Sequence, residues 1–205
     1  LREAFRFRTA AGDLIYREDK MFCDILEDCP VIAAVRDEES LERSFQSECS
    51  IIFVLYGDVC SIPDITERIK ARGKTAMIHL DMIGGLDSRE IAVDYIRRFT
   101  KADGIISTKT AQIRRAKELG LYTVYRFFLL DSRSVETIRK QSQLIRPDCM
   151  ELLPGIAPKV IARITKQQHI PVIAGGLISD REDVMAALQA GAASISTTKQ
   201  ELWFI

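Results

Sequence analysis

The sequence predicts an α/β protein, a compact TIM-like (β/α)8 barrel. Eight short apolar runs rich in β-branched residues alternate with amphipathic stretches along a chain of 205 residues. Most of these runs are apolar throughout, as expected for parallel strands that are covered on both faces. Eight strand–helix units on one short chain fit a closed barrel, with an open doubly wound sheet as the alternative. No GxGxxG follows the first run, which weakens a dinucleotide-binding fold.

The elements follow one another in a regular order. We expect strands at residues 31–35, 51–57, 75–81, 104–109, 122–130, 149–154, 171–175 and 194–198. Apolar residues recur at helical spacing within 62–70, 89–99, 112–119, 135–145, 159–166 and 183–190, and a last helical turn is expected at 199–203. The glycines that suit left-handed C-caps are Gly73, Gly120 and Gly191, and the candidate N-caps are Ser88 and Asp180.

Residues 1–20 stand outside this pattern, so we expect an N-terminal extension of unknown role followed by a single domain from 21 to 205. The extension mixes arginines with aromatic residues. A basic, aromatic arm that contacts nucleic acid is the functional alternative to a mere extension. The residues concerned are Arg2, Phe5, Arg6, Phe7, Arg8, Tyr16 and Arg17.

Composition excludes several classes of protein. The 29 Lys+Arg residues balance the 29 Asp+Glu residues, so no strongly basic coat covers the whole chain. Every apolar run is far shorter than the ~20 residues that span a bilayer, and no secretory signal pattern begins the chain. Five cysteines without CxxC spacing and only two histidines predict reduced thiols, a cytoplasmic protein, and neither a metal nor a cofactor.

Two pairs of segments about 90 residues apart are similar to each other. IGGLDSREI at 83–91 is similar to AGGLISDREDV at 174–184, and GIISTKT at 104–110 is similar to SISTTKQ at 194–200. This spacing maps the third unit onto the seventh and the fourth onto the eighth. A half-barrel duplication would produce it. Chance is the alternative, because Gly-Gly and Ser-Thr pairs are common in barrel loops.

The later pair of segments carries groups suited to a phosphate. In (β/α)8 barrels the loops after strands seven and eight often hold one. Gly175 and Gly176 would let backbone N–H groups approach an anion, and Ser196, Thr197 and Thr198 would add hydroxyl donors. The helical turn that follows would add its positive end. The alternative is that the glycines only permit a tight turn.

The earlier pair of segments offers the equivalent groups across the barrel. A second, weaker anion site is therefore a hypothesis, in which Lys109 supplies a full charge. Its members would be Gly84, Gly85, Ser107, Thr108 and Lys109.

Other polar residues interrupt the apolar strands. His79 and Asp81 lie two residues apart on one strand, so their side chains should face the same side. They could act as a general base and the carboxylate that orients it, bind a ligand hydroxyl, or only hydrogen-bond to each other. Glu151 sits within an apolar run, where a buried carboxylate needs a partner, and Arg126 on the neighbouring strand is the expected one. Whether that pair is structural or grips a ligand stays open.

Charge is unevenly placed along the chain. Residues 18–50 hold ten acidic and three basic residues, whereas residues 97–166 hold fifteen basic and six acidic ones. Such asymmetry indicates either an anionic partner or ordinary scatter on a solvated surface.

Taken together, several stretches resemble the glycerol uptake operon antiterminator family, whose members are glycerol-3-phosphate-responsive regulators. The combination of RFFLLDS, ELLPG and AGGLISDREDVMAAL is specific, and the resemblance runs from about Met21 to Phe204. The matching stretches are VIAAVRDEESLE, IIFVLYGDVCSI, ADGIISTKT, AKELGLYTVYRFFLLDS, ELLPGIAPKVI, IPVIAGGLISDREDVMAALQAGAASISTT and ELWF.

The resemblance implies a bacterial cytoplasmic regulator, not an enzyme, that senses glycerol 3-phosphate and binds the leader mRNA of glycerol operons, so that transcription passes a terminator. The predicted phosphate cradle would hold the ligand. The candidates at the ligand mouth are His79, Asp81, Lys109, Arg126 and Glu151. The candidates for RNA phosphate contacts are Arg97, Arg98, Lys101, Arg114, Arg115 and Lys117.

Two other classes of function remain open. The first is an isomerase, aldolase or lyase that acts on a phosphate ester, favoured only by His79, Asp81 and Lys109. GxSxG, Walker A and HExxH motifs are all missing. The second is a sensor that acts through a protein partner. The apolar end Trp203, Phe204 and Ile205 would pack on a second copy in a homo-oligomer or close its own barrel.

Overall fold

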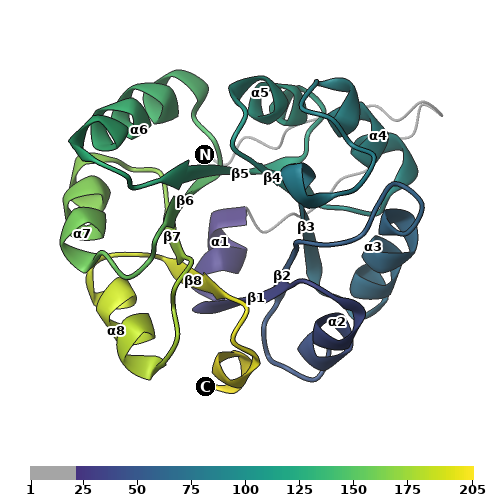
Figure 1. Cartoon of the computed structure of the whole chain (residues 1–205), viewed down its shortest axis with the longest axis horizontal. Helices are drawn as coiled ribbons and strands as arrows, with labels where there is room; N and C mark the ends of the chain where they lie inside the picture. The colour runs from purple at the N-terminus through teal and green to yellow at the C-terminus, as the bar shows by residue number, and fades with distance from the viewer. Residues whose placement is uncertain (1–21) are drawn as a thin grey trace, which may run out of the picture.

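Eight parallel strands close into a barrel in which each strand pairs with the next along the chain and β8 returns to β1 (Figure 1). The structure, a computed structural model, describes residues 22–205. The expectations for residues 1–20 therefore lie outside the described residues. The predicted barrel is confirmed. The strands are β1 Val31–Val35, β2 Ile51–Val54, β3 Thr75–His79, β4 Gly104–Ser107, β5 Tyr122–Phe128, β6 Cys149–Leu153, β7 Val172–Gly175 and β8 Ser194–Thr197.

Helices surround the barrel and follow its strands (Figure 1). Three short elements depart from this ring: α1 precedes β1, and the 3-10 helices η1 and η2 follow β3 and β8. The helices are α1 Phe22–Glu27, α2 Glu38–Ser44, α3 Ile62–Ala71, α4 Ile91–Phe99, α5 Thr110–Glu118, α6 Ser132–Ile145, α7 Pro158–Gln167 and α8 Arg181–Gln189, with η1 Leu80–Met82 and η2 Gln200–Phe204.

Local sequence explains where several helices begin and end. Gly73, Gly120 and Gly191 all have positive φ, which confirms the predicted left-handed caps. The Asp180 side chain accepts a hydrogen bond from the Asp183 N–H, which confirms that N-cap. The Ser88 N-cap is wrong, because α4 begins only at Ile91 and no side chain caps it.

Two helices were absent from the predicted set. The first, α2, begins with a capping box in which Asp37 and Ser40 exchange hydrogen bonds between side chains and backbone. The second, α1, lies across the N-terminal end of the barrel, where its Phe22 ring stacks on Tyr122 with centroids 5.0 Å apart (Figure 1). Six and seven residues are too few for a clear helical period.

The apolar residues form two layers. An inner cluster fills the barrel and includes Phe22 and Leu26 of α1 together with Phe53 and Met77. A larger outer cluster packs the barrel against its helices. Because α1 closes one end, the other end, where the strands finish, is the open mouth. Within residues 22–205, none of the helices combines the length and apolar content that a bilayer span requires.

Candidate functional site

A chain of polar groups crosses the inside of the barrel at the C-terminal ends of its strands. Arg126 and Glu151 are register partners on β5 and β6, and the arginine Nε donates to Glu151 Oε2 at 2.6 Å. Ser196 on β8 donates its hydroxyl to Glu151 Oε1 at 2.6 Å. The Glu151 side chain is only 1% exposed, so these bonds compensate a buried charge. The predicted pairing of Arg126 with Glu151 is therefore present.

Gly175 on β7 lets this network cross from β6 to β8. A Cβ at Gly175 would lie 2.5 Å from both Glu151 Oε1 and Ser196 Oγ, which no side chain tolerates. The space above Gly175 is thus filled by the protein itself rather than left open to an anion. The next residue, Gly176, has φ +73° and turns the chain out of the strand.

His79 ends β3 in a buried position facing the same mouth. Burial and the Arg126 guanidinium lower the pKa of His79 to about 4, so the imidazole is neutral near pH 7. Its Nδ1 atom is buried without a hydrogen-bond partner among residues 22–205, and it lies 4.0 Å from Asp81 Oδ2. The predicted pair of a general base and its orienting carboxylate is therefore not formed at hydrogen-bond distance.

Asp81 serves the loop after β4 instead. Its Oδ2 atom accepts from the N–H of Thr108 at 3.3 Å and from the Thr108 hydroxyl at 3.2 Å. The N–H of Gly84 donates to the Gly57 carbonyl, so it is also taken. A carboxylate of the chain thus occupies both donors of Thr108, whereas the N–H of Gly85 has no hydrogen-bond partner among residues 22–205. The predicted second anion site therefore lacks free donors at Thr108 and Gly84, whereas Lys109 beside it is exposed, and this site stays a prediction.

The equivalent turn after β8 has the same local geometry. Thr197 Oγ1 accepts from the N–H of Lys199 at 3.1 Å, just as Ser107 Oγ accepts from the N–H of Lys109 at 2.9 Å. Thr197 also donates its hydroxyl to the carbonyl of Ile178. That hydroxyl is therefore engaged behind the strand, not at the mouth where we predicted it.

The donors at the mouth of this second turn are free. Within residues 22–205, the N–H and hydroxyl of Thr198 have no hydrogen-bond partner, although Thr108 at the matching position donates both to Asp81. The N–H of Gly176 is likewise unpaired there. Backbone N–H groups that converge without a partner form a cradle for an anion. Of the predicted cradle, the structure therefore leaves Gly176 and Thr198 with available donors.

The end of the chain holds this turn in place. The indole N–H of Trp203 in η2 donates to the carbonyl of Thr197 at 2.9 Å, and the ring is 2% exposed. Arg43 lies over the Phe204 ring, with its guanidinium carbon 5.3 Å from the centroid. Trp203 thus packs on its own barrel, whereas Phe204 and Ile205 remain exposed.

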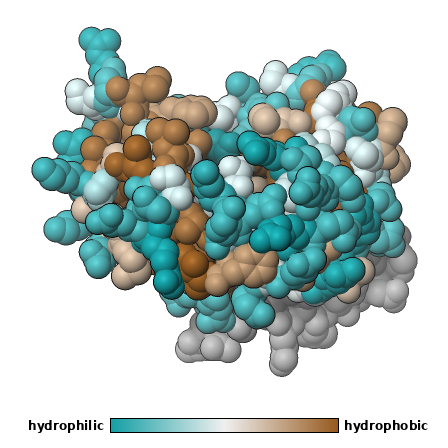
Figure 2. Space-filling view, turned by 60° about the horizontal axis from the view of Figure 1, so that its bottom comes forward, coloured by the Kyte–Doolittle hydropathy of each residue, from teal (hydrophilic) through white to brown (hydrophobic). Residues whose placement is uncertain are grey.

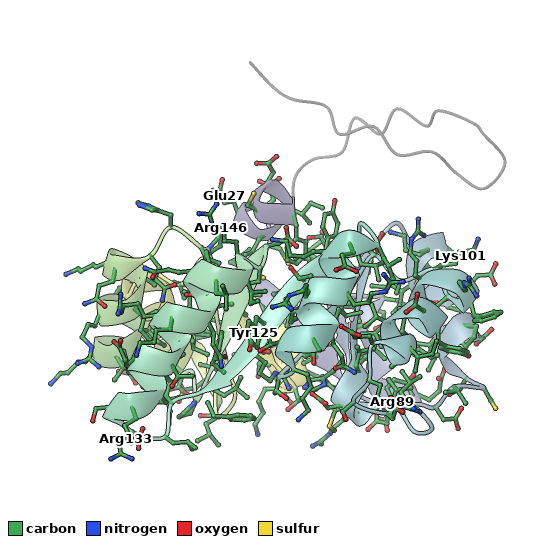
Figure 3. The ribbon with its side chains drawn as sticks, turned by 90° about the horizontal axis from the view of Figure 1, so that it is seen from above. Glu27, Arg89, Lys101, Tyr125, Arg133 and Arg146 are labelled. Atoms are coloured by element: carbon green, nitrogen blue, oxygen red, sulfur yellow. The ribbon has the colours of Figure 1, made fainter. Side chains whose placement is uncertain are left out.

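The bases predicted to contact RNA do not form one free surface. Arg115 pairs with Asp94 and Glu118, and Lys117 donates to main-chain carbonyls at the end of α6. Arg97 donates to the carbonyl of Leu119. The remaining bases of the set are exposed and have no ion pair among residues 22–205, although Lys101 lies at the end of the barrel away from the mouth (Figure 3). They are Arg98, Lys101 and Arg114.

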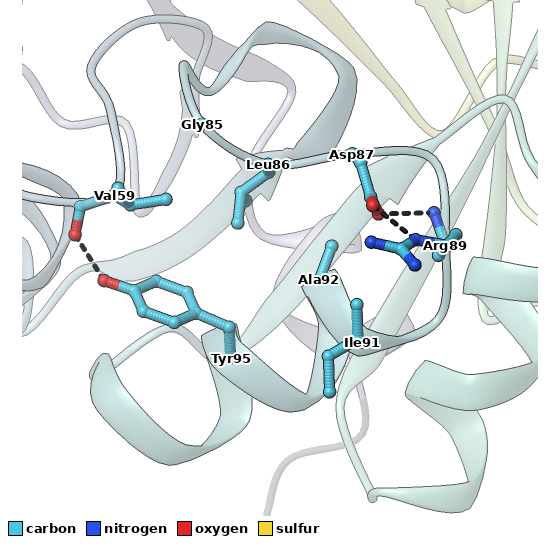
Figure 4. A pocket seen from close by; sticks show the side chains of 8 residues that line it. All are labelled: Val59, Gly85, Leu86, Asp87, Arg89, Ile91, Ala92 and Tyr95. Atoms are coloured by element: carbon cyan, nitrogen blue, oxygen red, sulfur yellow. Dashed lines mark hydrogen bonds and ion pairs between the residues drawn. The ribbon is translucent and has the colours of Figure 1, made fainter.

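A surface pocket of about 230 Å³ lies beside the mouth, between α4 and the loops after β2 and β3 (Figure 4). Its polar groups already bond to one another. Arg89 contacts Asp87 at 2.5 Å, and the Tyr95 hydroxyl donates to the carbonyl of Val59. Arg89 uses only its Nε for Asp87, so its two terminal nitrogens have no hydrogen-bond partner among residues 22–205.

Two contacts at the mouth escaped the sequence analysis. The bond from Ser196 to Glu151 joins strands that do not pair directly, and the contact of Asp81 with Thr108 joins two loops. Gly155 carries the third unpredicted feature, because its N–H donates to the carbonyls of Gly175 and Gly176. No sequence signal gave the distance across β7.

Comparisons with known proteins identify the family of this chain. Residues 31–203 match the family described as glycerol-3-phosphate responsive antiterminator. A curated relative, the YgcP protein of Escherichia coli (strain K12), is 43% identical over 179 residues, which cover 87% of this chain and 94% of that protein.

Two crystal structures have the same architecture. The glycerol uptake operon antiterminator regulatory protein from Listeria monocytogenes is 32% identical with a TM-score of 0.81, over 84% of this chain and 94% of that one. The glycerol uptake operon antiterminator-related protein from Thermotoga maritima is 35% identical with a TM-score of 0.76, over 85% and 98% of the two chains. The chain thus belongs to the glycerol-3-phosphate responsive antiterminator family, a family of transcription regulators in glycerol metabolism.

Proposed function

We propose that the protein is a cytoplasmic antiterminator that binds glycerol 3-phosphate at the barrel mouth and, in the liganded form, binds the leader mRNA of a glycerol operon. The observation that carries the ligand site is the contrast between Thr108 and Thr198. The first donates its N–H and hydroxyl to a carboxylate, whereas the second has both donors free. A phosphate oxygen at Thr198 would accept the bonds that Asp81 accepts at Thr108.

The rest of the ligand faces the polar network in this proposal. Arg126 uses its Nε for Glu151, and its two terminal nitrogens have no partner among the described residues. Those N–H groups, together with the neutral imidazole of His79, suit the hydroxyls of a glycerol moiety. Burial of the network keeps Arg126 fixed before the ligand arrives, which lowers the entropic cost of binding.

Regulation by the ligand requires that the protein has two conformations that differ in their affinity for RNA. A ligand that bound both conformations equally would shift nothing, so glycerol 3-phosphate must favour the conformation that binds RNA. A regulator is favoured over an enzyme because His79 and Asp81, the residues that suggested catalysis, do not form a hydrogen-bonded pair. The Aeropyrum pernix deoxyribose phosphate aldolase, 13% identical with a TM-score of 0.66 over 87% of this chain, shares the fold alone.

The test is a fluorescence-anisotropy titration of the full chain onto the leader transcript of the glycerol operon from its own genome, with and without glycerol 3-phosphate. An unrelated RNA of equal length is the control. We expect at least a tenfold tighter complex with the leader when the ligand is present. Equal binding with and without the ligand would contradict gating, and turnover of a triose phosphate would favour the enzyme.

A further inference from the structure

We infer that the exposed face of α7 is the surface that contacts RNA phosphates, and that its position beside the phosphate cradle makes this surface responsive to the ligand. This inference rests on the proposed function and adds the place on the molecule where RNA binds. The residues that carry it are Lys159, Arg163 and Lys166.

These three bases form one stripe along the helix. They stand at positions i, i+4 and i+7, which share one face of an α-helix. All three are exposed, while Ile161 and Ile164 on the opposite face are buried in the core. Within residues 22–205 none of the three has an ion pair, and α7 contains no acidic residue. The stripe is therefore an uncompensated line of positive charge.

Helix stability explains Lys166, which lies in the last turn, but not Lys159. Lys159 lies in the first turn of α7, where the helix dipole disfavours a cation and favours Asp or Glu. The α4–α5 surface also carries unpaired bases, but its Arg115 is neutralised by Asp94 and Glu118. An unpaired basic stripe whose first member opposes the local dipole suits an anionic partner such as a nucleic-acid backbone.

An apolar rim continues the stripe onto the mouth. Phe128, Leu130, Ile156 and Leu177 are 51%, 85%, 44% and 70% exposed, and they lie on the loops that precede α6, α7 and α8 or at the end of β5. Hydrophobic side chains gather on the mouth side of the α6–α8 half of the molecule (Figure 2). Unstacked RNA bases pack on exposed aromatic and apolar side chains, while basic residues track the backbone.

The loop that begins α7 touches the cradle directly. The N–H of Gly155 donates to the carbonyl of Gly176 at 3.0 Å, and α7 starts three residues later at Pro158. A Cβ at Gly155 would lie 3.0 Å from backbone atoms of Ala174 and Gly175, so only glycine permits this approach. A phosphate bound at Gly176 therefore stabilises the loop from which the basic stripe extends. No comparable bond links α4 or α5 to the cradle among residues 22–205.

The experiment compares two triple variants of the full chain. One removes the stripe (Lys159→Gln, Arg163→Gln, Lys166→Gln), and the matched control removes three exposed, unpaired bases of the predicted α4–α5 set (Arg98→Gln, Lys101→Gln, Arg114→Gln). Affinity for the leader transcript is measured by anisotropy at several salt concentrations with glycerol 3-phosphate present. Calorimetric titration with glycerol 3-phosphate alone reports on the ligand site.

We expect the α7 variant to bind RNA at least about tenfold more weakly. The slope of log affinity against log salt concentration should also become shallower by about 2, because each of the three lost phosphate contacts contributes ~0.7 to that slope. It should bind glycerol 3-phosphate as the unsubstituted protein does, and the control variant should bind RNA normally. Unchanged RNA binding by the α7 variant, or an equal loss in the control, would overturn the inference and leave the proposed function intact. Absence of leader binding by the unsubstituted protein would overturn both.

Discussion

The two halves of the barrel mouth use the same turn for opposite purposes. After β4, the turn donates its N–H and hydroxyl from Thr108 to Asp81, a carboxylate of the same chain. After β8, the corresponding donors of Thr198 have no partner among the described residues. A search for anion cradles should therefore ask less whether glycines and hydroxyls are present than whether the protein already satisfies their hydrogen bonds.

The largest expected effect is a loss of stability when the buried network of Arg126, Glu151 and Ser196 is broken. This network belongs to the β5–β8 half of the mouth. Glu151→Gln removes one charge of a buried pair and leaves Arg126 uncompensated, so it should lower the free energy of unfolding by about 3 kcal/mol. Asp81→Asn is the matched change in the other half. Because the Asp81 carboxylate is 26% exposed, this substitution should lower the free energy of unfolding by less than about 1 kcal/mol.

Urea denaturation followed through Trp203, the single tryptophan and a buried one, measures both variants. Equal losses of stability in the two variants would show that the halves do not differ in this way.

The next effect concerns the dependence of stability on pH. His79 has a folded pKa of about 4 and an ordinary unfolded pKa near 6.5, so the unfolded chain binds the extra proton in this interval. Stability should therefore fall as pH drops from about 6.5 towards 4, by at most about 3 kcal/mol. His79→Gln should flatten this part of the curve, measured by denaturation at each pH. A profile that is unchanged in the variant would assign the loss to other groups.

The smallest expected effect is on ligand affinity, when the hydroxyl of Thr198 or of Thr108 is removed. Thr198→Val removes a donor that we assign to the phosphate and should weaken glycerol 3-phosphate binding about tenfold, as expected for one hydrogen bond to a charged group. Thr108→Val removes the matching donor in the occupied half and should change ligand affinity less than about twofold. Calorimetric titration of both variants decides, and a greater loss for Thr108→Val would place the ligand in the other half.

Sequence alone predicts the barrel well because its signal is local. Continuous apolar runs mark strands that are buried on both faces, and each run was found in place. Six of the eight strands were predicted to end too late, for example at 57 instead of Val54 and at 81 instead of His79. Polar residues at these ends belong to the mouth loops, whose conformation depends on contacts across the barrel.

The site was predictable in residue type but not in contact. Burial of Glu151 within an apolar run required a partner, and the adjacent strand supplied Arg126. The preference of Asp81 for Thr108 over His79 was not accessible, because spacing two apart cannot give the direction of a loop that leaves the strand after His79. Likewise, no sequence pattern showed that the Thr197 hydroxyl points away from the mouth, towards the carbonyl of Ile178.

The carboxylate that Asp81 holds at the β4 turn has a consequence for ligand choice. Asp81 puts a fixed negative charge on one side of the mouth, and the proposed cradle lies on the other. The mouth would therefore accept one phosphate group and not two. A bisphosphate seated in the cradle would bring its second phosphate towards like charge, which disfavours it without any steric barrier. If the cradle holds the phosphate as we propose, we therefore expect metabolites phosphorylated at both ends to compete poorly with glycerol 3-phosphate, however well their carbon chains fit.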